Sequence, residues 1–329
     1  MKVLISATSF STLTPEPEER LRAEGYEILH NPYGRPMTAE ELKPLLRDVD
    51  AIAAGVDQFH PPAFDEAERL KVVARHGAGL DCVDLPECTR RGIVVANTPG
   101  ANAEAVADMA VGLMLAVARH IPEGDQCIKS GNWENTYGRD LFRATLGLLG
   151  LGRIGKGVAR RGRGFDMRLL AYDPYFDEKF AAEYGVERAE SVDQVLREAD
   201  FVSLHLPLMP ETRGFINQER LARMKPTAIL VNTARGAIID EVALADALKA
   251  GAIYGAGLDV YATEPPGDSP LVGCPRTVTL PHVSSNTPGA LRAMGDGVVE
   301  AIIAVLNGRK PEFLCNPEVY GGGRGSARP

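Results

Sequence analysis

Three side chains of different chemical types follow apolar runs in the second half of the chain: Arg235, Glu264 and His282. Each run has the length and composition of a strand. The predicted strands are Ile229–Asn232, Gly255–Asp259 and Val278–Leu280. Because open α/β sheets bind ligands at the carboxyl ends of their strands, the three side chains are expected on one ligand-binding edge.

These residue types suit hydride transfer at a 2-hydroxy acid. Oxidising an alcohol requires a base and reducing a ketone requires an acid, and a histidine can serve as either. A glutamate bonded to the imidazole would fix its tautomer and stabilise its protonated form. A planar guanidinium can hold a carboxylate and polarise the carbonyl beside it. The plainer interpretations are a surface charge for Arg235, a turn residue for Glu264 and a structural histidine for His282.

A glycine motif in the same half indicates the cofactor. Leu146–Gly155 reads LGLLGLGRIG, in which Gly150, Gly152 and Gly155 form a GxGxxG turn between a predicted strand and a predicted helix. The first glycine allows a sharp bend, the second lets backbone approach a pyrophosphate, and the third lets helix pack closely on strand. The motif therefore predicts a dinucleotide site.

The residue that follows the next predicted strand indicates which dinucleotide is bound. That strand runs from Met167 to Tyr172, and Asp173 follows it, eighteen residues after the last glycine of the motif. A carboxylate at this place can accept both ribose hydroxyls of an adenosine and would repel a 2′-phosphate. The sequence therefore favours NAD over NADP as the hydride carrier.

The elements that must position these residues alternate along the chain, as in parallel sheets covered by helices. Predicted strands of the first half are Val3–Ile5, Tyr26–Leu29, Ala51–Ala54, Val72–Arg75 and Ile93–Ala96. A long Ala-rich helix is expected at Asn102–Arg119. Six strands should follow this helix, namely Thr145–Leu149, Arg168–Tyr172, Phe201–Leu204, Ile229–Asn232, Gly255–Asp259 and Val278–Leu280. Six is the count for a complete dinucleotide-binding domain.

The last predicted helix, Pro288–Leu306, comes too late to belong to the second sheet and is expected to return to the first domain. The sequence therefore predicts an α/β fold with two doubly wound parallel sheets. A Rossmann NAD-binding domain (101–286) would be inserted into a discontinuous flavodoxin-like substrate-binding domain (1–100 and 287–320). Residues 321–329 are glycine-rich and are expected to form a flexible tail.

Composition and charge narrow the possible partners. The 329 residues are 45% hydrophobic and 24% charged, as in globular proteins, and the net charge of −8 argues against a nucleic-acid partner. No apolar stretch reaches the roughly 18 residues of a membrane span, and the N-terminus lacks a signal-peptide layout. Five cysteines without a CxxC pair favour free thiols in a reducing compartment and argue against a disulfide framework or a zinc site. A cytoplasmic location is therefore expected.

Several further segments carry a family resemblance: RHGAGLDCVD, AYDP, LHLPLMPETRGFI, LVNTARGAIIDEVAL, AGLDVYATEPP and LPHVSSNT. Together with the glycine motif, and in this order between Val72 and Asn316, they resemble the D-isomer-specific 2-hydroxyacid dehydrogenases. That family includes D-3-phosphoglycerate dehydrogenase and the glyoxylate/hydroxypyruvate reductases. The resemblance implies that Arg235 binds the substrate carboxylate, that Glu264 supports the histidine and that His282 is the acid/base.

The same resemblance implies the cofactor contacts. They would come from Gly150, Gly152, Arg153, Ile154, Gly155, Asp173, Leu206, Thr233, Ala234, Asp259 and Ser285. Arg153 and Ile154 would meet the pyrophosphate, and Asp259 would face the nicotinamide amide. His205, which also follows a strand, is interpreted as a loop residue on the cofactor side.

On the substrate side, the resemblance implies a first domain that closes onto the substrate, with contacts from Arg75, Gly77, Ala78 and Gly79. The helix at Asn102–Arg119 and the segment after it resemble the dimer contact of the family, so a homodimer is expected. Arg75 is either a cation for a substrate phosphate or an arginine on the domain surface.

Two departures from the phosphoglycerate dehydrogenase pattern bear on the substrate. Ala78 stands where those enzymes often carry a threonine, and the chain ends near residue 320, so appended regulatory domains are not expected. A phosphoglycerate dehydrogenase-like activity is expected, with glyoxylate/hydroxypyruvate reduction as the alternative. Two further functions could use the same scaffold: a corepressor-like protein that binds NAD without turnover, and a phosphite-type dehydrogenase.

Overall fold

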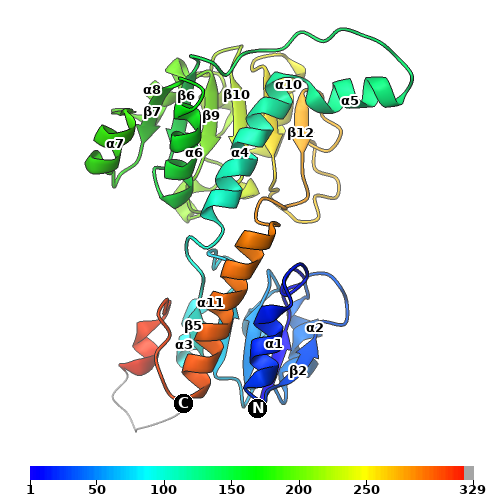
Figure 1. Ribbon diagram of the computed structural model, residues 1–329, viewed down its shortest axis with the longest axis vertical. Coiled ribbons are helices and arrows are strands. Elements are labelled where there is room, and N and C mark those ends of the chain that lie inside the picture. The colour runs from blue at the N-terminus through cyan, green and yellow to red at the C-terminus, as the bar shows by residue number, and fades with distance from the viewer. Residues whose placement is uncertain (322–329) are drawn as a thin grey trace. The chain divides into compact units, whose positions relative to one another are not determined.

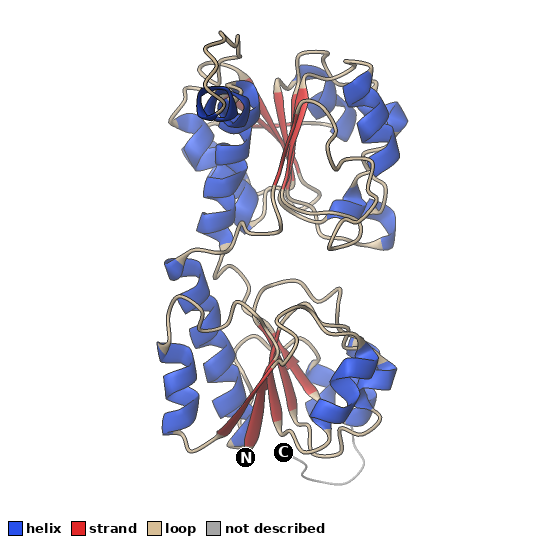
Figure 2. Ribbon diagram, turned by 90° about the vertical axis from the view of Figure 1, so that its right-hand side faces the viewer, coloured by secondary structure: helices blue, strands red, loops and turns tan. Residues whose placement is uncertain are grey.

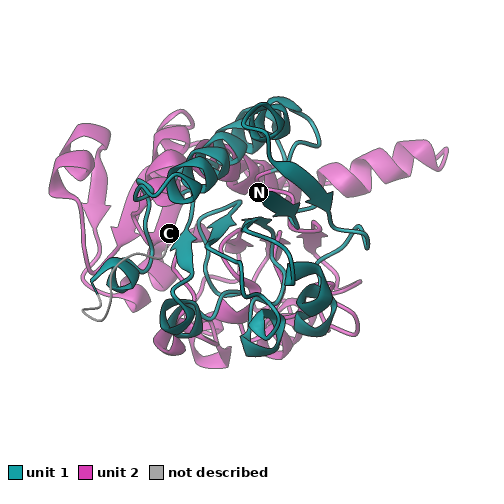
Figure 3. Ribbon diagram, turned by 90° about the horizontal axis from the view of Figure 1, so that it is seen from below, with its two compact units in different colours: residues 1–102, 286–329 teal, residues 103–285 magenta. Residues whose placement is uncertain are grey.

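The computed structural model describes residues 1–321, and the chain divides into two compact units (Figure 3). Unit 1 consists of residues 1–102 and the segment that begins at Asn286, and unit 2 is Ala103–Ser285. These limits lie within two residues of the domain boundaries expected from the sequence. Beyond Gly321, the predicted tail lies outside the described residues.

Unit 1 is built on a parallel sheet of five strands in the order β2-β1-β3-β4-β5. The strands are β1 (Lys2–Ile5), β2 (Glu27–His30), β3 (Ala51–Ala54), β4 (Val72–Arg75) and β5 (Val94–Ala96). This order is that of flavodoxin-like folds, so the flavodoxin-like prediction is confirmed.

Helices cover both faces of the unit 1 sheet (Figure 2). They are α1 (Glu16–Ala23) and α11 (Pro288–Leu306) on one face, and α2 (Ala39–Leu46), the 3-10 helix η1 (Pro61–Phe64) and α3 (Leu85–Arg91) on the other. Alternate strand residues supply the two cores: Leu4 and Ile52 pack with the second group, Val3 and Ala51 with the first. Helix α11, although last in the sequence, buries Val298 in this first core and lies beside α1 (Figure 1).

Unit 2 contains a parallel sheet of seven strands in the order β12-β11-β10-β9-β6-β7-β8. The strands are β6 (Thr145–Leu149), β7 (Arg168–Tyr172), β8 (Val186–Arg188), β9 (Phe201–Leu204), β10 (Ile229–Asn232), β11 (Gly255–Leu258) and β12 (Thr277–Thr279). The first six in chain order have the strand order of a Rossmann fold, which confirms that prediction.

The prediction of six strands is wrong by one, because the sequence did not reveal β8. This edge strand has three residues, and two of them, Glu187 and Arg188, are exposed. A charged edge strand protects the sheet against pairing with another chain, but it has no apolar periodicity by which it could be predicted.

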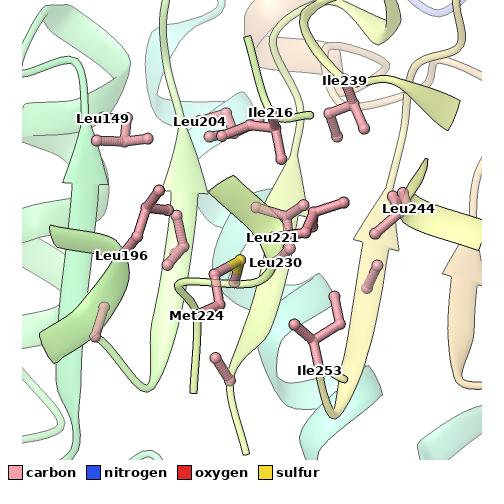
Figure 4. Packing of buried hydrophobic residues seen from close by; sticks show 14 of the residues in the cluster. Leu149, Leu196, Leu204, Ile216, Leu221, Met224, Leu230, Ile239, Leu244 and Ile253 are labelled. Atoms are coloured by element: carbon pink, nitrogen blue, oxygen red, sulfur yellow. The ribbon is translucent and has the colours of Figure 1, made fainter. Parts of the chain in front are cut away.

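Helices also cover both faces of the unit 2 sheet. One face carries α4 (Ala103–Ala118), α6 (Arg153–Arg163) and α7 (Glu178–Tyr184), and the other α8 (Val192–Glu198), α9 (Gln218–Leu221) and α10 (Glu241–Lys249). Figure 4 shows the second core, where Leu196, Leu221 and Leu244 of these helices pack on Leu204 and Leu230 of the sheet. Unit 2 also contains the 3-10 helices η2 (Pro210–Thr212) and η3 (Gly236–Ile238), whereas η4 (Pro317–Tyr320) belongs to unit 1.

The long helix predicted at Asn102–Arg119 is α4, and a further helix, α5 (Ile121–Lys129), follows it (Figure 1). His120, with a φ of +51°, separates the two. No single helix of residues 1–321 is long and apolar enough to cross a membrane, and α4 and α5 satisfy that test only as a pair bent by 62°. The cytoplasmic location stays a prediction.

The register of the unit 2 sheet decides where functional side chains meet. Tyr172, Leu149 and Leu204, the last residues of β7, β6 and β9, pair in one row. The row continues through Asn232, Leu258 and Thr279 at the ends of the other strands. The loops that follow these six strands therefore leave the sheet at the same edge, which we call the carboxyl edge.

Candidate active site

The glycine turn between β6 and α6 lies at the carboxyl edge of unit 2. Gly150 has a φ of +101°, which L side chains rarely adopt, and a Cβ there would lie 2.6 Å from the carbonyl oxygen of His205. A Cβ at Gly155 would overlap the carbonyl oxygen of Gly150. Both glycines are therefore required for the close packing of the turn against α6 and the loop after β9.

The start of α6 fits a pyrophosphate. Gly152 is the N-cap of the 11-residue helix, and the space where its Cβ would stand is open. Arg153, the first residue of α6, is exposed, and the half-buried Ile154 packs on the core. A backbone free of side chains at a helix N-terminus can donate N–H groups to an anion.

Asp173 lies at the glycine turn, as the sequence predicts. Its Oδ2 accepts a hydrogen bond from the Leu151 N–H at 2.7 Å, and its Oδ1 accepts one from the Tyr175 N–H at 2.7 Å. These two bonds fix the carboxylate between β6 and β7. The side chain is half-buried, so it can still accept hydrogen bonds from a ribose.

Buried polar atoms without a partner among the described residues gather after three strands of the carboxyl edge. They are Nδ1 and Nε2 of His205, Oγ1 of Thr233 and Oγ of Ser284. Burial lowers the pKa of His205 to about 3, so its imidazole is neutral near pH 7. Buried polar groups are usually satisfied, so buried polar atoms without a protein partner fit a polar ligand such as NAD. Leu206 and Ala234 lie half-buried in the same loops.

His282 and Glu264 form a hydrogen-bonded pair at this edge. Nδ1 of His282 lies 2.7 Å from Oε2 of Glu264, and the N–H of Tyr261 donates to Oε1 at 3.1 Å. Burial raises the pKa of Glu264, but the hydrogen bond and charge of His282, the Tyr261 N–H and the charge of Arg235 together outweigh burial and lower it. The glutamate is therefore a carboxylate near neutral pH and can hold an imidazolium.

The loop that carries His282 is fixed by a buried carboxylate. The two oxygens of Asp259, which is fully buried, accept hydrogen bonds from Val283 N–H at 2.8 Å and from Ser284 N–H at 2.9 Å. His282 itself has a φ of +54°, a region that non-glycine residues occupy rarely. Asp259 thus positions the histidine loop. Its predicted contact with the nicotinamide stays a prediction, as does that of the half-buried Ser285.

Arg235 follows β10 in a turn shaped by an asparagine that sequence reasoning missed. Asn232 is fully buried; its Nδ2 donates to the Arg235 carbonyl at 2.9 Å, and its Oδ1 accepts from Ala234 N–H at 3.0 Å. The guanidinium of Arg235 donates to the Ala234 carbonyl at 2.7 Å and lies near enough to lower the pKa of Glu264. The structure therefore brings Arg235, Glu264 and His282 together.

The predicted substrate residues of unit 1 follow β4. Arg75 is 5% exposed, so the interpretation as a surface arginine is wrong. Its guanidinium donates to the carbonyls of Gly79 at 3.0 Å, Ala54 at 3.0 Å and His76 at 3.3 Å. Ala78 and Gly79 complete the loop that it holds.

Comparisons with known proteins identify the family. The family model described as "D-isomer specific 2-hydroxyacid dehydrogenase, NAD binding domain" matches residues 111–284. A glyoxylate reductase of Thermococcus kodakarensis is 42% identical over 315 residues, which cover 93% of this chain and 94% of that protein. A D-3-phosphoglycerate dehydrogenase of Methanocaldococcus jannaschii is 41% identical over 283 residues, or 85% of this chain, and the match spans about half (54%) of that relative.

A solved structure is similar over 96% of the chain. The TT0316 protein of Thermus thermophilus superposes with a TM-score of 0.86 at 38% identity, covering 96% of this chain and all of that one. The glycine turn, Asp173 and the unpaired buried atoms are the features of unit 2 that fit NAD. The chain therefore belongs to the D-isomer-specific 2-hydroxyacid dehydrogenase family, with NAD as its cofactor.

Proposed function

We propose that this NAD-dependent D-2-hydroxyacid dehydrogenase reduces small, unphosphorylated 2-keto acids such as glyoxylate and hydroxypyruvate. The observation that carries the reaction type is the His282–Glu264 pair beside Arg235 at the carboxyl edge of unit 2. The observation that favours an unphosphorylated substrate is the place of Arg75, whose guanidinium is buried and bonded to three backbone carbonyls.

The other loops at the carboxyl edge of unit 1 support the same substrate class. The segments that follow β1, β3, β4 and β5 (residues 6–15, 55–60, 76–84 and 97–102) contain no lysine or arginine, and Arg35, in the segment that follows β2, is paired with Glu41. Recognition of a phosphate ordinarily uses such cations. The glyoxylate reductase of T. kodakarensis, which aligns along 94% of its own length, points in the same direction. We therefore place the glyoxylate/hydroxypyruvate alternative ahead of the phosphoglycerate dehydrogenase-like activity, with which the relative from M. jannaschii is also consistent.

In the proposed reaction, different residues of unit 2 have different roles. NADH held at the glycine turn and Asp173 would supply the hydride that C2 of the keto acid receives. The carbonyl oxygen then gains negative charge, and the His282 imidazolium gives it a proton, which yields the 2-hydroxy acid and a neutral imidazole. Glu264 orients the imidazole through Nδ1 and stabilises its charged form. Arg235 holds the substrate carboxylate, and in the oxidation direction the hydroxyl proton returns to His282.

A substrate panel tests the proposal. NADH oxidation by the purified protein would be compared for glyoxylate, hydroxypyruvate, pyruvate, a branched 2-keto acid and 3-phosphohydroxypyruvate. We expect the highest kcat/KM with glyoxylate or hydroxypyruvate. A clear preference for the phosphorylated substrate would refute the substrate class while leaving the reaction intact. Tight NADH binding without turnover of any keto acid would favour the corepressor-like function, and turnover of phosphite alone would favour the phosphite-type dehydrogenase.

We also propose that the enzyme is a homodimer, with α5 and residues 130–142 in the contact. No residue of α5 is buried, and Ile121 and Ile128 are both more than half exposed. In the segment that follows, Trp133 and Tyr137 are 87% and 85% exposed. Monomeric proteins rarely expose large apolar side chains in such a group, and a second copy of the chain is the partner that the family resemblance implies.

A further inference from the structure

The loop after β4 has every carbonyl of residues 76–79 bonded to the protein. The guanidinium of Arg75 donates to the carbonyls of His76 and Gly79, at 3.3 and 3.0 Å. The Gly77 carbonyl accepts from the N–H of Thr98 at 3.1 Å, and the Ala78 carbonyl accepts from Nδ2 of Asn97 at 2.8 Å. The four acceptors of the loop are therefore directed toward protein donors.

The N–H groups of the same loop are used differently. Gly77 N–H donates to Oγ1 of the buried Thr98 at 3.0 Å. Among residues 1–321, the N–H groups of Ala78 and Gly79 have no acceptor. Gly77 has a φ of +144°, open in practice only to glycine. Successive N–H groups that are free while their carbonyls are bound can together bind an anion, and the proposed function supplies one, the substrate carboxylate.

Arg75 occupies the centre of this arrangement. A Cβ at Gly77 would lie 3.3 Å from Nη2 of Arg75, so the loop backbone rests on the guanidinium. A third bond, to the Ala54 carbonyl at 3.0 Å, attaches the guanidinium to β3. The charge is balanced nearby by Asp57, which is fully buried and accepts from Ser6 Oγ at 2.6 Å and Met37 N–H at 2.8 Å.

We propose that Arg75 is a positioning residue for substrate binding: it holds residues 76–79 in the conformation that presents the N–H groups of Ala78 and Gly79 to the substrate carboxylate. It does so through its fork of donors to three carbonyls and does not itself contact the substrate. Because Nε and Nη1 are committed to the protein, a phosphate could reach this guanidinium only through Nη2 and not through a bidentate pair of donors. This role rests on the proposed function, because that function supplies the carboxylate.

Glyoxylate is the probe that separates positioning from recognition of a substrate side chain, since it consists only of an aldehyde and a carboxylate. For Arg75→Met we expect the KM for glyoxylate to rise roughly 10- to 100-fold, the factor for losing one charge-assisted hydrogen bond, with a smaller change in kcat. Hydroxypyruvate and 3-phosphohydroxypyruvate should lose affinity by the same factor. NADH affinity, a property of unit 2, should not change.

Three further variants control the experiment. Arg69→Met removes an arginine that binds the buried Asp50 before β3, at the opposite edge of the same sheet, and should leave the KM for glyoxylate unchanged. Arg75→Lys keeps the charge but not the fork, and should restore affinity only in part. Asn97→Ala releases the Ala78 carbonyl without disturbing a buried charge, so it tests the loop even if Arg75→Met does not fold. It should also raise the KM for glyoxylate.

The outcomes distinguish the two claims. If the wild-type enzyme turns over no 2-keto acid and NADH fluorescence shows no binding of oxalate, the proposed function is wrong and the role of Arg75 falls with it. If the wild-type enzyme is active but Arg75→Met and Asn97→Ala keep its KM for glyoxylate, only the positioning role is refuted. A loss confined to 3-phosphohydroxypyruvate would instead make Arg75 a phosphate ligand.

Discussion

Nδ1 of His282 lies 2.7 Å from Oε2 of Glu264, although eighteen residues separate the two in the chain. The side chains are 36% and 34% exposed, so the pair is open on one side while its hydrogen bond is fixed. With Nδ1 committed to the carboxylate, Nε2 is the nitrogen left to exchange a proton with substrate. The geometry thus assigns the two ring nitrogens different tasks.

Replacing His282 with alanine should lower kcat by roughly 10²- to 10⁴-fold, because the proton donor of the reduction is removed. NADH should still bind, since the glycine turn and Asp173 do not depend on this side chain. Steady-state kinetics with glyoxylate and NADH titration by fluorescence measure the two properties. Near-normal turnover would exclude His282 as the acid/base.

Glu264→Gln tests the charge of the partner separately from its size. The amide can still bond to the imidazole but cannot stabilise an imidazolium, so we expect kcat to fall by roughly 10²-fold with little change in NADH affinity. Glu241→Gln is a suitable control, because Glu241 accepts from Ala262 N–H at 2.7 Å in the same loop without touching the histidine. Equal losses in the two variants would mean that Glu264 acts only on loop structure.

Asp173→Asn should weaken the preference for NADH over NADPH. The asparagine keeps one acceptor oxygen for the backbone bonds from Leu151 or Tyr175 but removes the charge that repels a 2′-phosphate. The ratio of kcat/KM for the two cofactors measures the effect, with glyoxylate held at saturation. An unchanged ratio would place the contact with the adenosine ribose elsewhere.

The buried histidine His76 should make the folded protein less stable in acid. Burial, opposed by the Leu291 backbone and assisted by the nearby charge of Arg75, lowers its pKa to about 4. Since the unfolded histidine takes up a proton below about pH 6.5 while the folded one stays neutral, stability should fall as pH drops from 6.5 to 4. At pH 5 the loss is on the order of 2 kcal/mol.

Urea unfolding of the wild type and of His76→Gln at pH 7 and pH 5 checks this. The variant should lose the pH-dependent part of the unfolding free energy that His76 contributes. His60→Gln, at an exposed position of the same unit, is the control and should follow the wild type. If His76→Gln has the same pH dependence as the wild type, the histidine is protonated in the folded chain or exchanges freely with solvent.

If the exposed apolar side chains of α5 and residues 130–142 form the dimer contact, charged substitutions there should prevent dimerisation. Ile128→Lys combined with Trp133→Lys should convert the dimer to a monomer, because each lysine would place a charge in an apolar contact. Sedimentation velocity measures the state directly. Val242→Lys, at another exposed apolar position of unit 2, should leave the assembly unchanged. A wild-type protein that sediments as a monomer would refute the proposal.

Local patterns in the sequence were sufficient for much of the molecule. The GxGxxG turn and Asp173 are a strand–turn–helix–strand unit, whose geometry depends on nearby residues and on glycine at required positions. Apolar runs of three to five residues predicted eleven of the twelve strands of residues 1–321, because strands buried in a parallel sheet demand such runs. The strand β8 was not predicted, because an exposed edge strand needs no apolar pattern.

Only the tertiary structure decided how distant loops hold one another. Nothing near Arg75 in sequence indicates that its Nε and Nη1 donate to the carbonyls of Ala54, His76 and Gly79, and the sequence left phosphate binding open. Asp259, likewise, is bonded to the loop of His282. These bonds join segments that follow different strands, and sheet register brings such segments together. Residue types along a chain specify which groups can bond, but long-range packing selects the partners.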